Sequence, residues 1–196
     1  MSKPDPSAVK KERNKTIRWV VTIFFLTIVI SGAISLLSDE IMSHSGMMVA
    51  FLILLFIILI GILFDIIGVA VTSADEKPFH SMAARKVPGA QEAIRLLRNA
   101  ERVSSICNDV IGDICGVISG SASATIAAQI LSNFEFSWPN AVSLIMSALV
   151  AGLTVGGKAI GKTFAMNSCT LIVHTAGKII FALRHIPDFL RKKKQK

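Results

Sequence analysis

The chain has 196 residues, of which 52% are hydrophobic and 17% are charged, and its mean hydropathy is +0.61. This balance is too apolar for a soluble domain of this size and indicates an integral membrane protein. The net charge of +8 does not indicate a nucleic-acid partner, because the basic residues collect in the segments between the apolar ones.

Four apolar segments cover residues 16–37, 47–71, 103–131 and 141–163. Each is near or above the roughly 20 residues that a helix needs to cross a hydrocarbon core. The first two are almost purely aliphatic and aromatic, whereas the last two are rich in Gly, Ala, Ser and Thr. The sequence therefore predicts an all-α membrane protein with four transmembrane helices, in which lipid-facing and packing roles are divided between the two pairs.

The distribution of basic residues predicts the orientation. Nineteen of the 21 lie at or before the start of the first segment, between the second and third, or after the fourth, and the loops at 38–46 and 132–140 contain none. The positive-inside bias places both termini in the cytoplasm, with the protein in the plasma or inner membrane of the cell. The N-terminal pattern also imitates a signal peptide, and cleavage near Ser35 would leave three spans with the N-terminus outside. The length of the first apolar run favours an uncleaved helix.

The segments outside the spans have helical patterns of their own. Residues 79–83 and 90–97 each carry apolar side chains on one face, which predicts two short amphipathic juxtamembrane helices. Residues 171–183 are strongly apolar but too few to span, so they predict a third interfacial helix, ended by Pro187.

The predicted organisation is one membrane domain with two charged tails. Residues 1–15 are polar and predict a disordered basic cytoplasmic tail, residues 16–185 form the helical domain with its juxtamembrane helices, and residues 186–196 form a second basic cytoplasmic tail. The expected partners are the lipid bilayer and, through the basic tails, anionic lipid headgroups. No nucleic acid is expected.

Charged residues inside the apolar segments are the main functional signal. Asp109 and Asp113 lie one helical turn apart in the third segment, Asp65 lies near the end of the second, and Lys158 lies in the fourth. At about 1.5 Å per residue, all four fall within about 15 Å of the cytoplasmic ends of their helices. Because charges in a membrane pair or line cavities, we expect these side chains to face one another rather than lipid.

Two interpretations of this cluster remain open. In the structural one, Lys158 pairs with Asp109 or Asp113 and fixes the register of the helices. In the functional one, carboxylate, amide and hydroxyl oxygens bind Mg²⁺ or another divalent cation, while Lys158 acts as a gating charge that replaces the absent ion. The candidate metal ligands are Asp65, Asn108, Asp109 and Asp113, with Ser73 and Ser105 as accessory oxygens.

Small residues predict how the last two spans pack. Gly112, Gly116 and Gly120 recur at a spacing of four in the third segment, and Gly157 and Gly161 do so in the fourth. Such stripes let helix backbones approach closely, so we expect a tight antiparallel pair. No serine, cysteine or histidine arrangement offers a nucleophile with a base, and we do not expect an enzyme.

Several short motifs resemble the membrane domain of the CNNM/CorC divalent-cation transporters. Residues 70–73 resemble the end of that family's first core helix, and Met82-Ala83 with Gly89-Ala90 resembles its juxtamembrane pattern. Residues 96–105 are similar to the start of its next helix, and residues 157–163 to its Gly-Glu-x-x-Pro-Lys-Thr exit motif. The resemblance covers roughly 100 residues in the same order.

The resemblance implies three core helices, juxtamembrane helices, a homodimer and a cation pocket near the middle of the domain, and hence Mg²⁺ transport. It also shows departures. The family's Ser-x-Ser-Glu falls on residues 65–68, where Asp65 is new and the acid is missing. Its Gly-Asn pair falls near residues 110–111, and the exit-motif Glu and Pro are Lys158 and Gly161.

These departures leave two other classes open. One is a non-transporting membrane scaffold whose pocket is closed by an Asp–Lys ion pair and which oligomerises through the glycine stripe of the third segment. The other is a holin-like pore former, suggested by the small size and the basic C-terminal tail.

Overall fold

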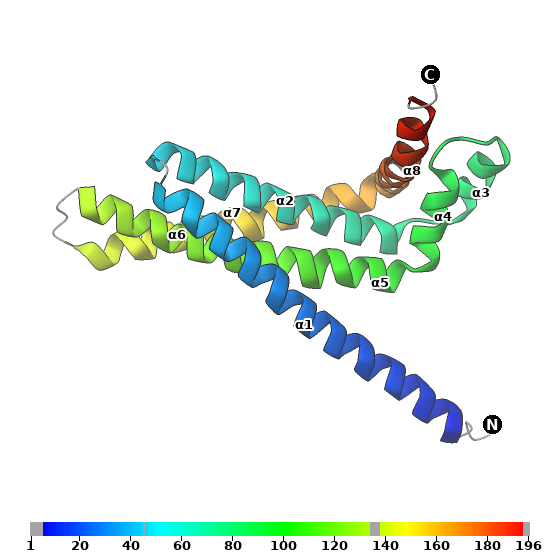
Figure 1. Cartoon of the computed structure of the whole chain (residues 1–196), viewed down its shortest axis with the longest axis horizontal. Coiled ribbons are helices and arrows are strands. Elements are labelled where there is room, and N and C mark those ends of the chain that lie inside the picture. Colours follow the sequence, from blue (N-terminus) through cyan, green and yellow to red (C-terminus); the bar gives the residue numbers. More distant parts are fainter. Residues whose placement is uncertain (1–5, 45, 134–137, 194–196) are drawn as a thin grey trace.

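The computed structural model of the protein describes residues 6–44, 46–133 and 138–193, and this part of the chain is helical with no strand. The all-α prediction is therefore confirmed. The long helices α1 (Pro6–His44), α2 (Met47–Ser73) and α7 (Pro139–Asn167) run back and forth with a fourth one composed of three consecutive pieces (Figure 1). Among the described residues, four stretches are long and apolar enough to cross a membrane: Thr16–Ser38, Met47–Ser73, Ala100–Asn133 and Asn140–Asn167. These correspond to the four predicted spans.

The third spanning helix has an internal irregularity. It begins as α5 (Ala100–Ser105), continues as the π-helix η1 (Ile106–Gly112) and ends as α6 (Asp113–Asn133). A π-helix has more residues per turn than an α-helix, so it changes which side chains face the neighbouring helices. Segments of this kind occur frequently at functional sites, and this one contains Asn108 and Asp109.

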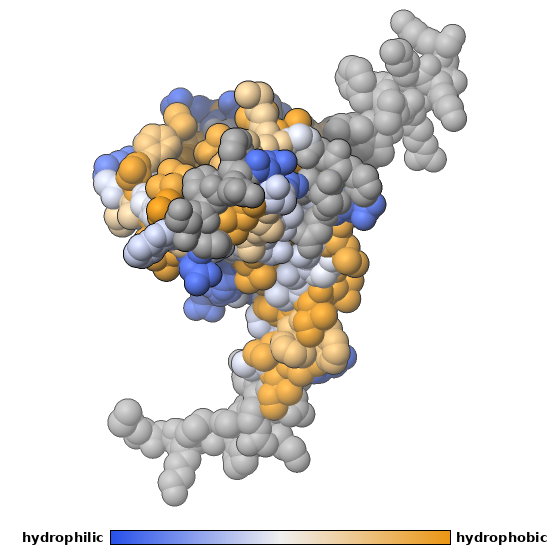
Figure 2. All heavy atoms as spheres, turned by 90° about the vertical axis from the view of Figure 1, so that its left-hand side faces the viewer, coloured by the Kyte–Doolittle hydropathy of each residue, from blue (hydrophilic) through white to orange (hydrophobic). Residues whose placement is uncertain are grey.

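Helices α2, α6 and α7 form the core of the bundle. At the end near the α1–α2 and α6–α7 connections, Leu54, Ile58 and Ile126 are buried together with small residues. The outer surfaces of the spans carry many exposed large apolar side chains, as expected of helices that face lipid. Figure 2, seen from this end, shows such side chains in orange along the downward arm of α1.

Helix α1 is peripheral and contacts mainly the third spanning helix. Ile23 and Ile30 pack against a buried row on that helix, which contains Val110, Ile114 and Ile118. The helix begins at Pro6, within the segment predicted as a basic tail, while residues 1–5 lie outside the described chain. The reason is that Ala, Lys, Glu and Arg favour helix, and a helix already formed by the span extends easily through them.

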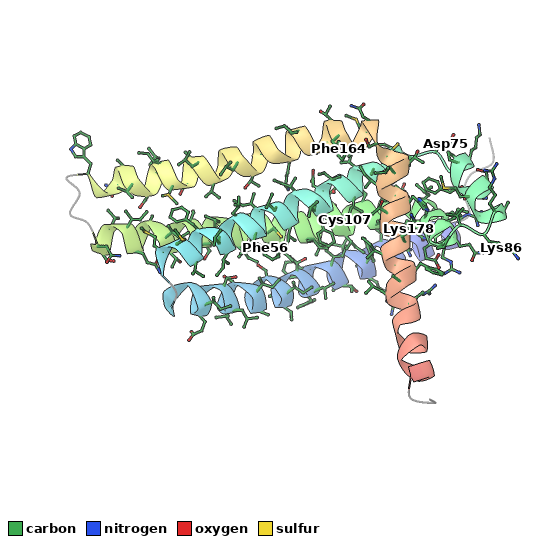
Figure 3. All side chains as sticks on the ribbon, turned by 90° about the horizontal axis from the view of Figure 1, so that it is seen from above. Phe56, Asp75, Lys86, Cys107, Phe164 and Lys178 are labelled. Carbon is green, nitrogen blue, oxygen red and sulfur yellow. The ribbon has the colours of Figure 1, made fainter. Side chains whose placement is uncertain are left out.

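Three further helices cover the opposite end of the bundle. The predicted juxtamembrane helices are confirmed as α3 (Lys77–Ala84) and α4 (Ala90–Arg98), and α8 (Cys169–Lys193) lies across the ends of the spans (Figure 3). Phe79, Ala93 and Val173 are fully buried where α3, α4 and α8 meet the ends of α2 and α7. The three helices are therefore packed onto the bundle as a cap.

Helix α8 is longer than predicted. Pro187 does not end it, and the helix includes residues 191–193 of the predicted basic tail, while residues 194–196 lie outside the described chain. A proline removes one backbone hydrogen bond and disfavours a helix interior without always ending the helix.

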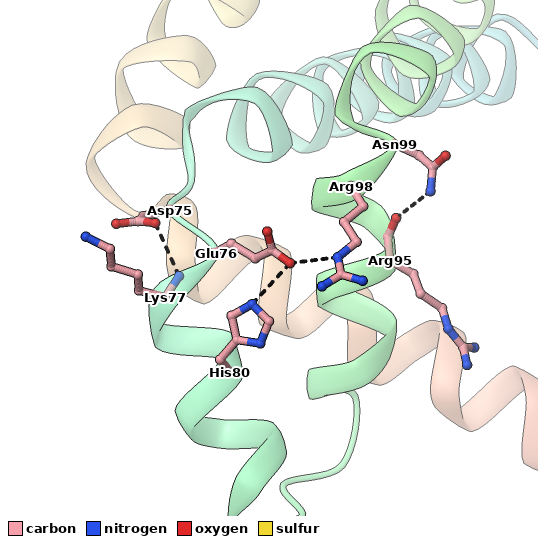
Figure 4. Close-up of polar contacts among 7 residues, drawn as sticks. All are labelled: Asp75, Glu76, Lys77, His80, Arg95, Arg98 and Asn99. Atoms are coloured by element: carbon pink, nitrogen blue, oxygen red, sulfur yellow. Dashed lines mark hydrogen bonds and ion pairs between the residues drawn. The ribbon is translucent and has the colours of Figure 1, made fainter.

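Polar contacts connect α3 to α4 on the outside of the cap. The Arg98 Nε donates a hydrogen bond to Glu76 Oε1 at 2.9 Å, and His80 Nε2 lies 3.2 Å from the same oxygen (Figure 4). These side chains are mostly solvent-exposed, so their contribution to stability is small and the apolar cluster beneath them dominates.

The helices α4 and α8 cross at two glycines. Gly89 has a φ of 84°, which favours glycine, and the backbone of α8 at Gly177 and Lys178 lies directly against it. A Cβ on Gly177 would collide with the Gly89 carbonyl oxygen and lie 3.0 Å from the Ala93 nitrogen. The position of α8 therefore depends on the absence of a side chain at residue 177.

We predict that Gly177→Ala lowers the free energy of unfolding by about 1–3 kcal/mol, because the added methyl group overpacks a backbone contact. The matched control is Gly32→Ala in α1, where a Cβ meets nothing within 4 Å. Alanine favours helix over glycine by up to about 1 kcal/mol, so the control leaves the stability unchanged or raises it. Thermal unfolding in detergent measures both, and equal stabilities of the two variants would contradict this view of the crossing.

Candidate functional site

A buried ion pair joins α2 to α7. The Lys158 Nζ lies 3.8 Å from Asp65 Oδ1, and the side chains are 23% and 6% exposed. Asp65 is enclosed because Gly157 and Gly161, on either side of Lys158 in the chain, lie against Ile62 and Ile66 of α2. The small residues of α7 thus bring the lysine to the aspartate.

Asn108 approaches the same region from the π-helix η1. A Cβ on Gly68 would overlap the Asn108 amide oxygen, so the amide lies directly on the α2 backbone one turn after Asp65. The Asn108 Nδ2 donates a hydrogen bond to Ser104 Oγ at 3.2 Å. The lysine amine is close as well, since a Cβ on Gly112 would lie 3.3 Å from Lys158 Nζ. Asp65, Asn108 and Lys158 therefore lie in one region, where α2, η1 and α7 meet, and we call these three residues the polar cluster.

Two buried oxygens of the polar cluster have no partner among the residues that the structure describes. These atoms, Asp65 Oδ2 and Asn108 Oδ1, accept no hydrogen bond from that part of the chain. A buried acceptor without a partner destabilises the fold. Nearly all buried acceptors in proteins therefore bind a donor, a water or an ion. The cluster thus presents one carboxylate oxygen and one amide oxygen that a cation or a water molecule could bind.

Asp109 and Asp113 are not in the polar cluster. Both residues are exposed on the outer surface of the third spanning helix, and neither makes an ion pair within the described chain. The expectation that Lys158 pairs with Asp109 or Asp113 is therefore wrong, and Asp65 is its partner. The inner face of η1 and α6 is occupied instead by Val110 and the apolar residues that follow it at helical spacing.

The remaining predicted ligands are also separate. Ser73 is exposed at the end of α2, and Ser105 is half-buried at the end of α5 and makes no side-chain hydrogen bond to the described residues. In the part of the chain that the structure describes, no three His, Cys, Asp or Glu side chains are close enough to hold a metal ion together. Of the proposed ligand set, Asp65 and Asn108 are the residues placed in the region of the polar cluster.

The five glycines that were predicted to pack the last two spans together do not all make that contact. Gly112 lies beneath the Lys158 side chain, and Gly157 and Gly161 lie against α2 rather than against the third spanning helix. At Gly116 and Gly120, an added Cβ would meet nothing within 4 Å. The predicted use of all five glycines in one antiparallel contact is therefore wrong, because two of them face outward.

Two residues at the site lie outside the predicted ligand set. Gly68 provides the space for the Asn108 amide. Ser104 holds that amide through its hydroxyl group. Glycine at a helix interior is the usual sign of a close approach, but the π-helix that directs Asn108 toward Gly68 has no recognisable sequence pattern.

Comparisons of the chain with protein-family models, with curated proteins and with solved structures find no match.

We predict that Lys158→Met lowers the free energy of unfolding by about 3 kcal/mol or more, because it leaves the buried Asp65 carboxylate without its cation. The double variant Asp65→Asn with Lys158→Met should recover most of this loss, since neither charge then remains. Chemical or thermal unfolding in detergent measures the double-mutant cycle. Additive effects of the two substitutions would show that the two side chains do not interact.

Proposed function

We propose that the protein binds and transports a cation at the polar cluster, in the manner of a diverged CNNM/CorC membrane domain. The cation would bind Asp65 Oδ2 and Asn108 Oδ1, and Lys158 would hold the place of the cation while the site is empty. The observation that carries this proposal is the pair of buried oxygens without partners beside a lysine that approaches the carboxylate only to 3.8 Å.

The arrangement of the resembling segments supports this proposal. Asp65 lies where the family has Ser-x-Ser-Glu, and Lys158 lies where its exit motif has Glu. These positions meet in space in this chain, on α2 and α7. In terms of the resemblance, an acid on α2 thus faces a base on α7, so that a charged site lies between these two segments.

Lys158 would compete with the cation. An ammonium group at Asp65 repels a metal ion, so binding requires the lysine to move away or to lose its proton. Movement is feasible because the Lys158 side chain is 23% exposed and lies over Gly112, which has no side chain to restrain it. Exchange of a lysine for a cation at one carboxylate would couple binding to a displacement of this side chain.

The ligand chemistry favours a hard cation that keeps part of its water. One carboxylate and one amide oxygen are fewer ligands than a Ca²⁺ site needs, whereas Mg²⁺ commonly binds through one or two carboxylates and several waters. We therefore propose Mg²⁺ as the first cation to test. Asp109 and Asp113 are not included in this site, because they are exposed on the other side of the helix.

A second candidate is a non-transporting membrane scaffold. The observation in its favour is the ion pair itself, because a lysine that permanently neutralises Asp65 closes the polar cluster to cations. In this case the pair fixes the register of α2 and α7, and the function lies on the surface of the bundle.

We predict that Lys158→Met increases Mg²⁺-dependent thermal stabilisation of the purified protein, because it removes the competing cation from Asp65. Asp65→Asn should abolish the Mg²⁺ effect, and Asp109→Asn serves as a control that also removes one acid but leaves the polar cluster intact. The wild type should show a smaller effect and take up Mg²⁺ in proteoliposomes. If neither the wild type nor Lys158→Met responds to Mg²⁺, cation binding at this site is refuted and the scaffold remains.

A further inference from the structure

A polar cavity lies in the cap, between the α3–α4 connection and α8. Its volume is about 340 Å³, which is within the range of small-molecule sites. The residues that give this cavity its chemical character are Lys86, Gln91, Glu92 and Phe181. A base, an acid, an amide and an aromatic ring therefore line one space, which we call the cap cavity.

Glu92 places a largely buried carboxylate at the cap cavity. Its side chain is 10% exposed, and its ion pair with Arg95 is long, because Arg95 Nη1 lies 3.7 Å from Glu92 Oε1. This separation exceeds that of a hydrogen bond, and Arg95 is 59% exposed, so solvent weakens the pair. The Glu92 carboxylate accepts no hydrogen bond within the described chain. An ammonium group in the cavity would give it a charge-assisted hydrogen bond.

Lys86 provides a cation at the same cavity. Its φ of 56° makes it the one non-glycine residue of the described chain with a positive φ. It follows the end of α3, where the Val87 N–H donates to the Met82 carbonyl oxygen at 3.0 Å. Glycine is the usual residue at such a helix end, whereas lysine adds a charged side chain there. Lys86 is exposed and makes no ion pair within the described residues, so it is available to an anion.

Backbone donors at the same cavity also suit an anion. Helix α4 begins after Gly89, which provides no side-chain cap. The N–H groups of Gln91 and Glu92 make no backbone hydrogen bond within the described chain, and both residues line the cap cavity. Such N–H groups carry partial positive charge and bind phosphate oxygens. The cavity thus offers donors for a phosphate group next to a carboxylate for an ammonium group.

The position of the cap cavity favours a lipid as the source of these two groups. Helix α8 lies across the ends of the spans, and Gly177 lies directly against Gly89 (Figure 3). Phe181 follows Gly177 by one turn and brings a half-buried ring to the cavity. Lys86 and Lys178 lie at this same end of the molecule (Figure 3). Lipid headgroups begin where apolar spans end, and aromatic and basic side chains are enriched at that level.

We propose that the cap cavity binds the headgroup of an aminophospholipid, with the phosphate at Lys86 and the first turn of α4 and the primary amine at Glu92. The chemistry that it recognises is a phosphate ester that carries a primary amine. This site differs from the attraction of the basic tails to anionic lipids, because it requires both charges of the headgroup. It lies in the cap, away from the polar cluster, and does not depend on cation binding there.

Two lipids of equal net charge test the proposal on the unmodified protein. Native mass spectrometry of the wild type in detergent, with equal amounts of phosphatidylethanolamine and phosphatidylcholine, measures how much of each lipid stays bound. Phosphatidylethanolamine should be retained roughly tenfold more, because the methylated amine of phosphatidylcholine cannot donate a hydrogen bond to Glu92. Equal retention of the two lipids would overturn the proposal.

Single substitutions locate the binding. Glu92→Gln should abolish the preference for phosphatidylethanolamine, and Lys86→Gln should weaken the binding of both lipids, since both contain the phosphate. Glu101→Gln and Lys77→Gln remove exposed charges outside the cavity and should leave the preference unchanged. Thermal unfolding verifies that each variant is folded. A preference that survives Glu92→Gln would contradict the assignment of the amine.

A soluble competitor distinguishes a lipid from a free metabolite. O-phosphoethanolamine carries the same phosphate and amine without acyl chains. At the same concentration it should displace little of the bound phosphatidylethanolamine, because it lacks the hydrocarbon that contacts the apolar surface around α8. Complete displacement would show that the cavity selects a soluble ester, and the assignment to a lipid would be wrong.

Discussion

The close approach of α7 to α2 is the constraint on which the rest of the structure depends. Gly157 and Gly161 lie against Ile62 and Ile66, and this contact brings Lys158 within 3.8 Å of Asp65. Removing two charges from water is costly, so the pair is stable only because each ion supplies the counter-charge for the other. Gly68 of α2 acts in the same way toward η1, since it admits the Asn108 amide. Charge pairing and backbone contact therefore stabilise one arrangement of three helices.

The intramembrane charges of this protein are of two kinds. Asp65 and Lys158 face each other inside the bundle, whereas Asp109 and Lys162 face outward at one depth. The π-helix η1 lies at the point of separation, because it contains both Asn108, which faces α2, and Asp109, which faces outward. The inward-facing amide and the outward-facing acid are therefore neighbours on opposite sides of one helix turn.

The sequence predicted the helices well, but it did not predict which face of the third spanning helix points into the bundle. Apolar length and the 3.6-residue period were sufficient for the four spans and for α3 and α4, since these signals are local. Asp65 was not predicted as the partner of Lys158. Charged side chains in a membrane were expected to face the interior of the bundle, and this expectation placed Asp109 and Asp113 beside the lysine instead. On that helix both faces are plausible as interior, one lined by Val110 and Ile114 and the other by glycines and acids. Only the packing of α1 and α2 on the apolar face decides between them.

The distance between the Lys158 Nζ and the Asp65 carboxyl carbon in a bilayer is the most direct test of the central claim. Solid-state NMR dipolar coupling between labelled lysine nitrogen and aspartate carbon measures this distance with and without Mg²⁺. Direct contact is expected in Mg²⁺-free membranes, and a longer distance is expected when Mg²⁺ is added. Absence of the contact in Mg²⁺-free membranes would contradict the ion pair, and with it both the cation site and the closed scaffold.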